Sequence, residues 1–171
     1  MLVRKAVYKP CFLLFNFMFF SAFPAFSANV SVIIVETCLS DEHVDSLSSV
    51  WESGIMDVLF ESGHIVSNAQ SIKIQRNAEE DIPEEVRASI EEAEAGGSEY
   101  FIMAVLKYVE NNNRDVVNKP IQVTLKVISL ITHKIIYKEI ISKPVSSTQR
   151  DEFANAQKAA HIIMPYIGGK L

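Results

Sequence analysis

The sequence predicts a mixed α+β domain whose elements follow one another in the order β-α-β-α-β-β-β-α. Two observations predict this class. In the first half of the chain, short β-branched runs alternate with stripes of apolar residues at helical spacing. From Gly97 to Ser142, three strand patterns then follow one another with only loops between them. Strands joined by short loops pair antiparallel. We therefore expect a mixed sheet that ends in an antiparallel meander and packs with helices in two or three layers.

Residues 1–27 are predicted to be a secretory signal peptide, and residues 28–171 a single domain. Three basic residues precede an apolar run from Cys11 to Phe26, and small residues stand at Ala25 and Ser27, as signal peptidase requires. Cleavage after Ser27 makes Ala28 the first residue, and cleavage one residue later is the alternative. An uncleaved segment would be a membrane anchor, but the apolar run is shorter than the roughly 20 residues that span a bilayer.

Removing 27 of the 171 residues leaves a chain of 144 residues, which is one domain with room for a core. The removed segment contains three of the 16 basic residues and none of the 21 acidic ones, so the formal charge changes from −5 to −8. Nucleic acid and anionic membrane surfaces bind clustered positive charge, so this balance argues against both as partners. The mature chain is therefore expected to be soluble and periplasmic or secreted.

Cys38 is the only cysteine that remains after cleavage, so the sequence predicts no intramolecular disulfide and no thiolate-rich metal site. Neither Cys11 nor Cys38 stands at the end of an apolar run behind small residues, where a lipoprotein signal places its cysteine. In an oxidising compartment Cys38 could instead join two copies of the chain in a homodimer. We expect no metal and no cofactor.

The alternating half begins with a strand at Val30–Glu36, which is apolar on both faces and therefore predicted to be central. A helix is expected from a cap at Ser40 to the Gly63 stop, with Trp51 as a core anchor. Short strands should follow at His64–Ser67 and Ile72–Ile74.

A second helix should open at Asp81, which forms a capping-box pattern with Glu84, and should end at Gly96-Gly97. Its outer face is rich in glutamate and is predicted to be solvated. The first of the three strands between Gly97 and Ser142 is expected to run from Tyr100 to Val109.

The last two strands are predicted to form a hairpin around a two-residue turn at Thr132-His133. That turn places Lys126 opposite Glu139 on a solvent-exposed face, Leu125 opposite Ile140, and Ile128 opposite Tyr137. His133 is unusual there because such turns favour glycine or asparagine. A final helix capped by Ser147 or Thr148 should end near Met164, because Pro165 cannot continue it.

The motif Gly97-Ser98-Glu99-Tyr100 and the hairpin built on Val123–Val127 and Leu130–Ile135 are similar to patterns of known envelope domains. Over about Val30 to Met164, the chain resembles the extracytoplasmic domains of three proteins. They are the curli-secretion lipoprotein, the penicillin-binding-protein activator lipoprotein and, in its amino-terminal domain, the Tol-system protein TolB. The chain departs from them at His133, where the pattern has glycine, and in lacking a lipoprotein cysteine. The resemblance implies a non-enzymatic protein that acts through protein contacts, and it supplies no functional residues.

The candidate ligand site is the segment Glu36–Asp41, which joins the first strand to the first helix. Ligands bind at this junction in α/β sheets, and free N–H groups at a helix start favour anions. Thr37, Cys38 and Ser40 are the expected contacts. A helix start near Cys38 could also lower its pKa and make it a nucleophile.

Three functions remain open. The leading hypothesis is a non-enzymatic accessory protein of the cell envelope that binds another envelope protein. The alternatives are a small-molecule or anion binder at Glu36–Asp41 and, third, a thiol-dependent enzyme using Cys38. The sequence contains no Gly-x-Ser-x-Gly, His-Glu-x-x-His or Walker-type motif. We therefore propose no catalytic residues from the sequence and expect the four histidines to be structural or exposed.

Overall fold

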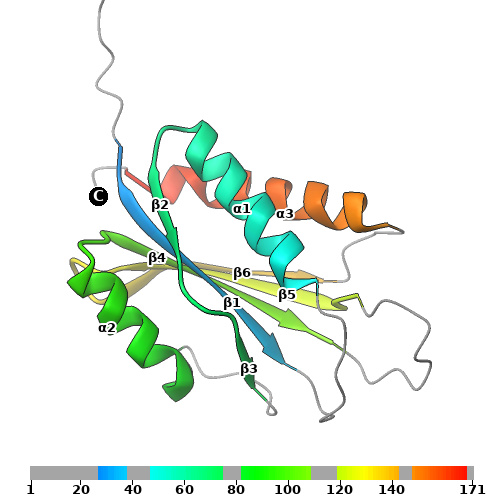
Figure 1. Cartoon of the computed structure of the whole chain (residues 1–171), viewed down its shortest axis with the longest axis horizontal. Helices are drawn as coiled ribbons and strands as arrows, with labels where there is room; N and C mark the ends of the chain where they lie inside the picture. Colours follow the sequence, from blue (N-terminus) through cyan, green and yellow to red (C-terminus); the bar gives the residue numbers. More distant parts are fainter. Residues whose placement is uncertain (1–26, 38–46, 75–81, 109–118, 143–147, 169–171) are drawn as a thin grey trace, which may run out of the picture.

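The computed structural model contains a twisted mixed sheet with helices α1 and α3 on one face and helix α2 on the other (Figure 1). The structure describes residues 27–37, 47–74, 82–108, 119–142 and 148–168. Its element order follows the predicted β-α-β-α-β-β-β-α pattern, with the second strand divided into two short pieces. The predicted α+β class is confirmed.

The sheet has the strand order β2-β1-β4-β5-β6, and β3 also pairs with β1. β2 and β3 pair in turn with the first and second halves of β1, so they act as one interrupted edge strand. The first three strands and β4 are parallel, and β4, β5 and β6 form the predicted antiparallel meander. The strand bounds are Asn29–Thr37 for β1, Ile65–Asn68 for β2, Ile72–Ile74 for β3, Tyr100–Lys107 for β4, Gln122–Ser129 for β5 and Lys134–Ser142 for β6.

β1 is central because both of its faces are covered. Val32 and Ile34 belong to the core under α1 and α3, whereas Ile33 and Val35 belong to the core under α2. All four side chains are at most 1% exposed. A strand buried on both faces must be apolar at successive positions, which explains the unbroken apolar run in the sequence.

Helices α1 (Ser48–Glu61) and α3 (Gln149–Ile163) pack side by side on the sheet. A Cβ atom at Gly54 would lie 2.6 Å from the Cβ of Ala156, so the crossing depends on a missing side chain. Trp51 is fully buried as predicted, and its indole Nε1 donates a 2.8 Å hydrogen bond to Glu152 of α3. α1 begins later than expected, and the predicted start at Ser40 lies outside the described residues.

The other helical predictions differ from the structure mainly at their ends. The second helix is a 3₁₀ turn at Glu84–Val86 followed by α2 at Arg87–Ala95, and the predicted cap Asp81 lies outside the described residues. Thr148 caps α3 in a full capping box with Asp151. α3 ends at Ile163 and continues as the 3₁₀ turn η3 (Met164–Tyr166), as Pro165 predicts. The Tyr166 ring stacks on Tyr137 of β6 at a centroid distance of 4.2 Å.

The predicted register of the β5–β6 hairpin was wrong by one residue. Leu125 pairs with Glu139, Lys126 with Lys138 and Val127 with Tyr137, and a bulge then shifts the pairing so that Ile128 lies opposite Ile135. The loop has four residues, Leu130–His133, rather than two. His133 adopts the left-handed backbone with φ of 53°, the conformation that glycine would take more readily.

The prediction that Lys126 lies on a solvent-exposed face was also wrong. Its residue is only 1% exposed, and it pairs with the fully buried Met103 of β4. The predicted alternation of the β5 side chains between two faces is correct, but both faces of this strand are covered near Lys126. The sequence pattern identified the two faces, and the structure shows that both are buried there, because Leu125, Lys126 and Val127 are each at most 1% exposed.

Candidate functional site

The predicted ligand segment starts at the carboxyl end of β1, where only Glu36 and Thr37 are described. Cys38, Ser40 and Asp41 lie outside the described residues, so their predicted roles stay predictions. Thr37 is 6% exposed, and its hydroxyl donates to the main-chain carbonyl of Leu106 at 3.4 Å. Its one hydroxyl proton is therefore used inside the sheet.

Glu36 is the charged group at this end of β1, and the residue is 5% exposed. Its Oε2 lies 3.6 Å from the ammonium nitrogen of Lys73 on β3, and its Oε1 accepts no hydrogen bond. A buried carboxylate attracts a cation or a hydrogen-bond donor and repels an anion. The described part of the segment therefore does not favour the predicted anion site.

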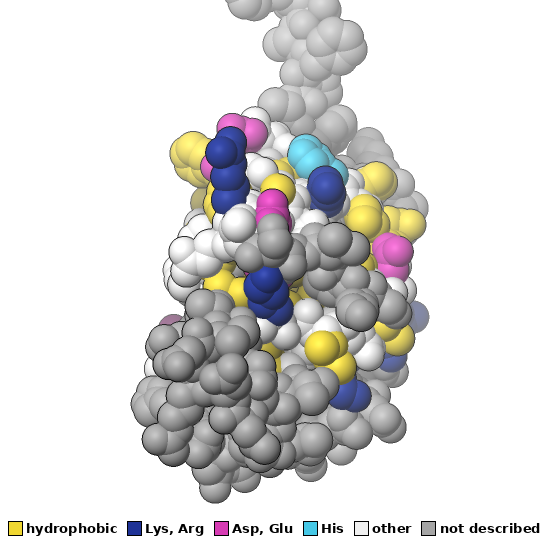
Figure 2. Space-filling view, turned by 90° about the vertical axis from the view of Figure 1, so that its right-hand side faces the viewer, with side chains coloured by type: hydrophobic (Ala, Val, Ile, Leu, Met, Phe, Trp, Pro, Cys, Tyr) yellow, Lys and Arg dark blue, Asp and Glu magenta, His cyan; other side chains and the backbone are white. Residues whose placement is uncertain are grey.

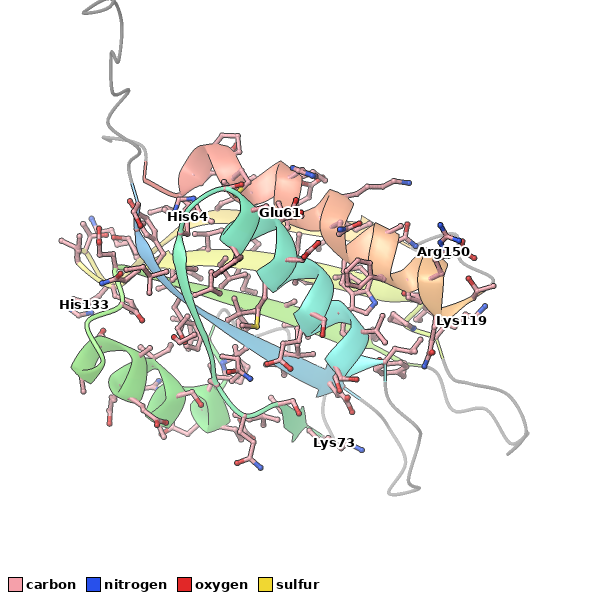
Figure 3. All side chains as sticks on the ribbon, turned by 45° about the horizontal axis from the view of Figure 1, so that its top comes forward. Glu61, His64, Lys73, Lys119, His133 and Arg150 are labelled. Carbon is pink, nitrogen blue, oxygen red and sulfur yellow. The ribbon has the colours of Figure 1, made fainter. Side chains whose placement is uncertain are left out.

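The same end of the molecule carries charges of both signs. Figure 3 places Lys119, before β5, and Arg150, in the first turn of α3, near one another at this end. Figure 2 views the end directly, and its basic, acidic and apolar side chains are interspersed rather than gathered in one patch. The described residues of this face therefore form no uniformly charged surface that would select nucleic acid or another polyanion.

The strand β2 forms an exposed edge of the sheet. Ile65 and Ala69 donate their N–H groups to β1 carbonyls at 3.0 and 2.9 Å. Successive residues of a strand direct their backbone groups to opposite sides, so Val66 and Asn68 direct theirs away from β1. Within the described part of the chain, no strand pairs with that side of β2. Figure 1 shows β2 at the front of the sheet.

The side chains along this edge are apolar or uncharged. Ile65 is 65% exposed, and Phe60, in the last turn of α1 just before β2, is 75% exposed. No Asp, Glu, Lys or Arg occurs between Ile65 and Ser71. An uncharged edge strand with exposed apolar side chains is the kind of edge that accepts a further strand.

The opposite edge strand, β6, differs in charge and in regularity, although it also exposes an apolar residue, Ile140. It contains Lys134, Lys138 and Glu139, and a bulge interrupts its pairing with β5. Charged side chains and bulges are the features by which proteins prevent unwanted pairing at a sheet edge. β2 is therefore the less protected of the two edges.

His64 lies beside the start of both β1 and β2. Its Nδ1 accepts a 3.2 Å hydrogen bond from the main-chain nitrogen of Ala28. Both residues are buried, at 7% and 2% exposure, and burial lowers the pKa of the imidazole below its ordinary value of 6.5. His133 and His161 are exposed, and His43 lies outside the described residues, so the described histidines are structural or exposed as predicted.

Among the described residues, no group of three His, Cys, Asp or Glu side chains is placed to hold a metal ion. Within the same residues, no helix is both long enough and apolar enough to cross a membrane.

Comparison with known proteins finds solved structures with a similar fold but no relatives by sequence. No protein-family model matches the chain, and no curated protein does. The PelC dodecamer protein from Paraburkholderia phytofirmans is 12% identical, with a TM-score of 0.43 over 85% of this chain and 91% of that one. The LpoB C-terminal domain from Escherichia coli is 12% identical, with a TM-score of 0.41 over 71% and 84%.

TolB from Acinetobacter baumannii is also similar, at 12% identity and a TM-score of 0.36, over 80% of this chain and 27% of that one. The similar structures thus include TolB, one of the proteins that the sequence resembles. At these identities and TM-scores, the function of none of these proteins transfers to this chain.

Sequence reasoning missed three features of the molecule. Glu152 is fully buried against Trp51, and the signal was available, because it stands four residues before Ala156 on the apolar stripe of α3. The contact between His64 and Ala28 carries no sequence signal, because 36 residues separate them. The open edge at β2 could not be seen without the strand order.

Proposed function

We propose that this protein is an exported, non-enzymatic accessory domain of the cell envelope that binds a partner protein through the open edge of β2. The partner supplies an extended segment that adds a strand beside Ile65–Asn68. The exposed, uncharged edge of β2 is the observation that carries the proposal. Main-chain hydrogen bonds to the outward groups of Val66 and Asn68 give affinity, and the side chains of Ile65 and Phe60 give apolar contact.

Export is supported by where the fold begins. β1 starts at Asn29, two residues after the predicted cleavage site at Ser27, so removing residues 1–27 deletes no part of the described sheet. The proposed location is periplasmic or extracellular. The N-terminal residue of the protein purified from a cell-envelope fraction tests this, with Ala28 expected and an intact Met1 as the contradictory result.

The binding proposal is tested by comparing substitutions on the two sheet edges. A partner is first captured from envelope extract on the wild-type domain, identified and purified, and its Kd is then measured against each variant. Ile65→Lys and Ser67→Lys place a charge on the β2 edge, whereas Ile140→Lys places the same charge on β6, where Ile140 is 54% exposed. We expect at least a tenfold loss of affinity for each β2 variant and less than a twofold change for Ile140→Lys.

Val66→Pro tests the backbone contribution separately. It removes an N–H group that points away from β1, and proline is tolerated in edge strands on that side. Binding should fall as with Ile65→Lys while the thermal melting curve shows a folded domain. Equal binding by wild type and all β2 variants would refute the proposed edge. Loss of binding only in Ile140→Lys would assign the partner to β6 instead.

A further inference from the structure

The buried start of β1 makes a specific contact with the turn that follows α1. The main-chain nitrogen of Ala28 donates to His64 Nδ1 at 3.2 Å, and the Ala28 carbonyl accepts from the N–H of Ile65 at 3.0 Å. The backbone of the turn that carries the imidazole is held in place, because the main-chain N–H of His64 donates to the Leu59 carbonyl and Gly63 takes a left-handed φ of 84°. Both polar backbone groups of Ala28 are therefore satisfied in a buried place.

Cleavage after Ser27 changes the chemistry of this contact without moving its atoms. The donor is then a primary α-amine, which is charged at neutral pH if its pKa stays near the ordinary value of about 7.7–8.0. A buried ammonium needs an acceptor, and only a neutral imidazole with its proton on Nε2 offers Nδ1 as one. The hydrogen bond becomes charge-assisted and correspondingly stronger.

We propose that His64 is the binding site for the mature N-terminus, so that the α-ammonium group of Ala28 is held against Nδ1 at the start of the sheet. This inference rests on the export that we propose above, and it selects cleavage after Ser27 over cleavage after Ala28. A chain that began at Asn29 would lose the donor, the acceptor and the buried methyl group of Ala28.

Acidic residues adjoin this contact. The main-chain N–H of Glu99 donates to the carbonyl of Asn29, the residue after Ala28. Figure 3 places Glu61, in the last turn of α1, at the same end of the molecule as His64. β2 contributes no charged residue, and Ala28 itself contributes only its amine. The exposed carboxylate of Glu61 is present in the free-amine and acetylated forms alike, so a difference between the two forms reports the charge on Ala28.

The test uses three purified forms of the domain, each made by removing an N-terminal tag. One begins with a free amine at Ala28, the second carries an acetyl group on the same nitrogen, and the third begins at Asn29. Acetylation keeps the N–H donor and removes the charge, so it is the matched control. Because each N-terminus is set in vitro, the result does not depend on where the cell cleaves the precursor.

The tautomer and the proton affinity of the His64 imidazole are measured by NMR. A contact that is merely structural would not make them depend on the charge at Ala28. We expect the Nε2–H tautomer in both Ala28 forms, and a proton affinity at least ~10-fold lower in the free-amine form, because the ammonium repels an imidazolium. The Asn29 form should melt at a lower temperature than the free-amine form. His64→Asn, which keeps an acceptor, should preserve that difference, and His64→Leu should reduce it.

The proposal is overturned if His64 titrates identically in the free-amine and acetylated forms. It is also overturned if the form that begins at Asn29 melts at the same temperature as the form that begins at Ala28. An Ala28 start found in cells together with either of these results would leave export intact and refute the role of His64.

Discussion

A buried hydrogen bond between Trp51 and Glu152 joins helices α1 and α3. Both residues are fully buried, and the donor nitrogen and acceptor oxygen lie 2.8 Å apart. A carboxylate inside a core must be hydrogen-bonded, because an unsatisfied buried charge is costly. This explains why the only tryptophan in the chain is where it is.

Trp51→Phe should therefore destabilise the domain by about 2–4 kcal/mol, since it removes a donor to a buried carboxylate and also reduces core volume. Trp51→Phe in a Glu152→Leu background should cost less, because no buried carboxylate then loses its donor. Urea denaturation of the four proteins in this cycle measures the coupling. Equal costs in the two backgrounds would show that the hydrogen bond contributes nothing beyond packing.

His64 makes stability depend on pH in the mildly acidic range. Burial lowers the pKa of its imidazole, so below pH 6.5 the unfolded chain takes up a proton that the folded chain resists. Its contribution is therefore complete above about pH 6.5 and declines as the pH falls toward the lowered folded pKa. The slope cannot exceed about 1.4 kcal/mol per pH unit for one proton.

We expect the free energy of unfolding, measured between pH 5 and 8, to fall more steeply with acid in the wild type than in His64→Asn. The asparagine keeps an acceptor near the position of Nδ1 and does not titrate. His161→Asn, at an exposed position of α3, is the control and should leave the curve unchanged. Parallel curves for the wild type and His64→Asn would contradict this account.

At the scale of the elements, the crossing of α1 and α3 depends on Gly54. A methyl group there would lie 2.6 Å from Ala156 Cβ and 2.9 Å from the Phe153 carbonyl oxygen, which is closer than real contacts allow. Alanine gains up to ~1 kcal/mol of helix propensity over glycine, but separating two packed helices costs typically ~1–3 kcal/mol. The steric effect should prevail.

Gly54→Ala is accordingly expected to lower the free energy of unfolding by about 1–2 kcal/mol in urea denaturation. Ser53→Ala, on the exposed side of the same turn of α1, is the matched control and should be neutral or slightly stabilising. Stabilisation by Gly54→Ala would show that the two helices separate readily, which conflicts with the tight crossing.

The β5–β6 hairpin contains a residue in an unfavourable backbone region. His133 has φ of 53°, and its imidazole lies 3.1 Å from Glu94 at the end of α2. Both side chains are partly or largely exposed, so this contact contributes little. His133→Gly should raise the free energy of unfolding by up to ~1 kcal/mol, whereas His133→Val should lower it, because β-branched residues strongly disfavour this conformation. A thermal melting series of the two variants checks the order.

The elements themselves could be predicted from sequence, and their pairing only in part. Helical and strand periodicity gave every described element, and Pro165 gave the end of α3. The predicted register of the hairpin was wrong because a bulge and a four-residue loop add residues that strict alternation does not reveal. The prediction that Lys126 is exposed failed because the pattern of a single strand does not show what covers each of its faces.

At the scale of the whole molecule, the strand order determines which surface is available for binding. Among the strands that the structure describes, β1, β4 and β5 are internal, and the edges are formed by β2 with β3 on one side and by β6 on the other. β6 is charged and bulged, and β2 is not. The order places the buried start of β1 next to the start of β2, so the proposed mature N-terminus would lie at the same corner as the open edge.

The candidate site could be predicted from sequence least well. The junction at Glu36–Asp41 follows from a general rule for α/β sheets, and the described part of it holds a buried carboxylate and a hydroxyl that is already hydrogen-bonded. The β2 edge followed from no motif. A partner that hydrogen-bonds to main-chain groups requires few particular side chains, so such a site is difficult to recognise in a single sequence.

The claim that β2 accepts a partner strand is tested most directly by amide hydrogen exchange in the purified complex. Val66 and Asn68 direct their N–H groups outward, whereas Ile65 already donates to Ala28 of β1. Binding should slow exchange at Val66 and Asn68 by at least tenfold, change Ile65 little, and leave Lys138 and Ile140 of β6 unaffected. If Val66 and Asn68 exchange equally fast in the free and bound domain, the partner does not pair with β2.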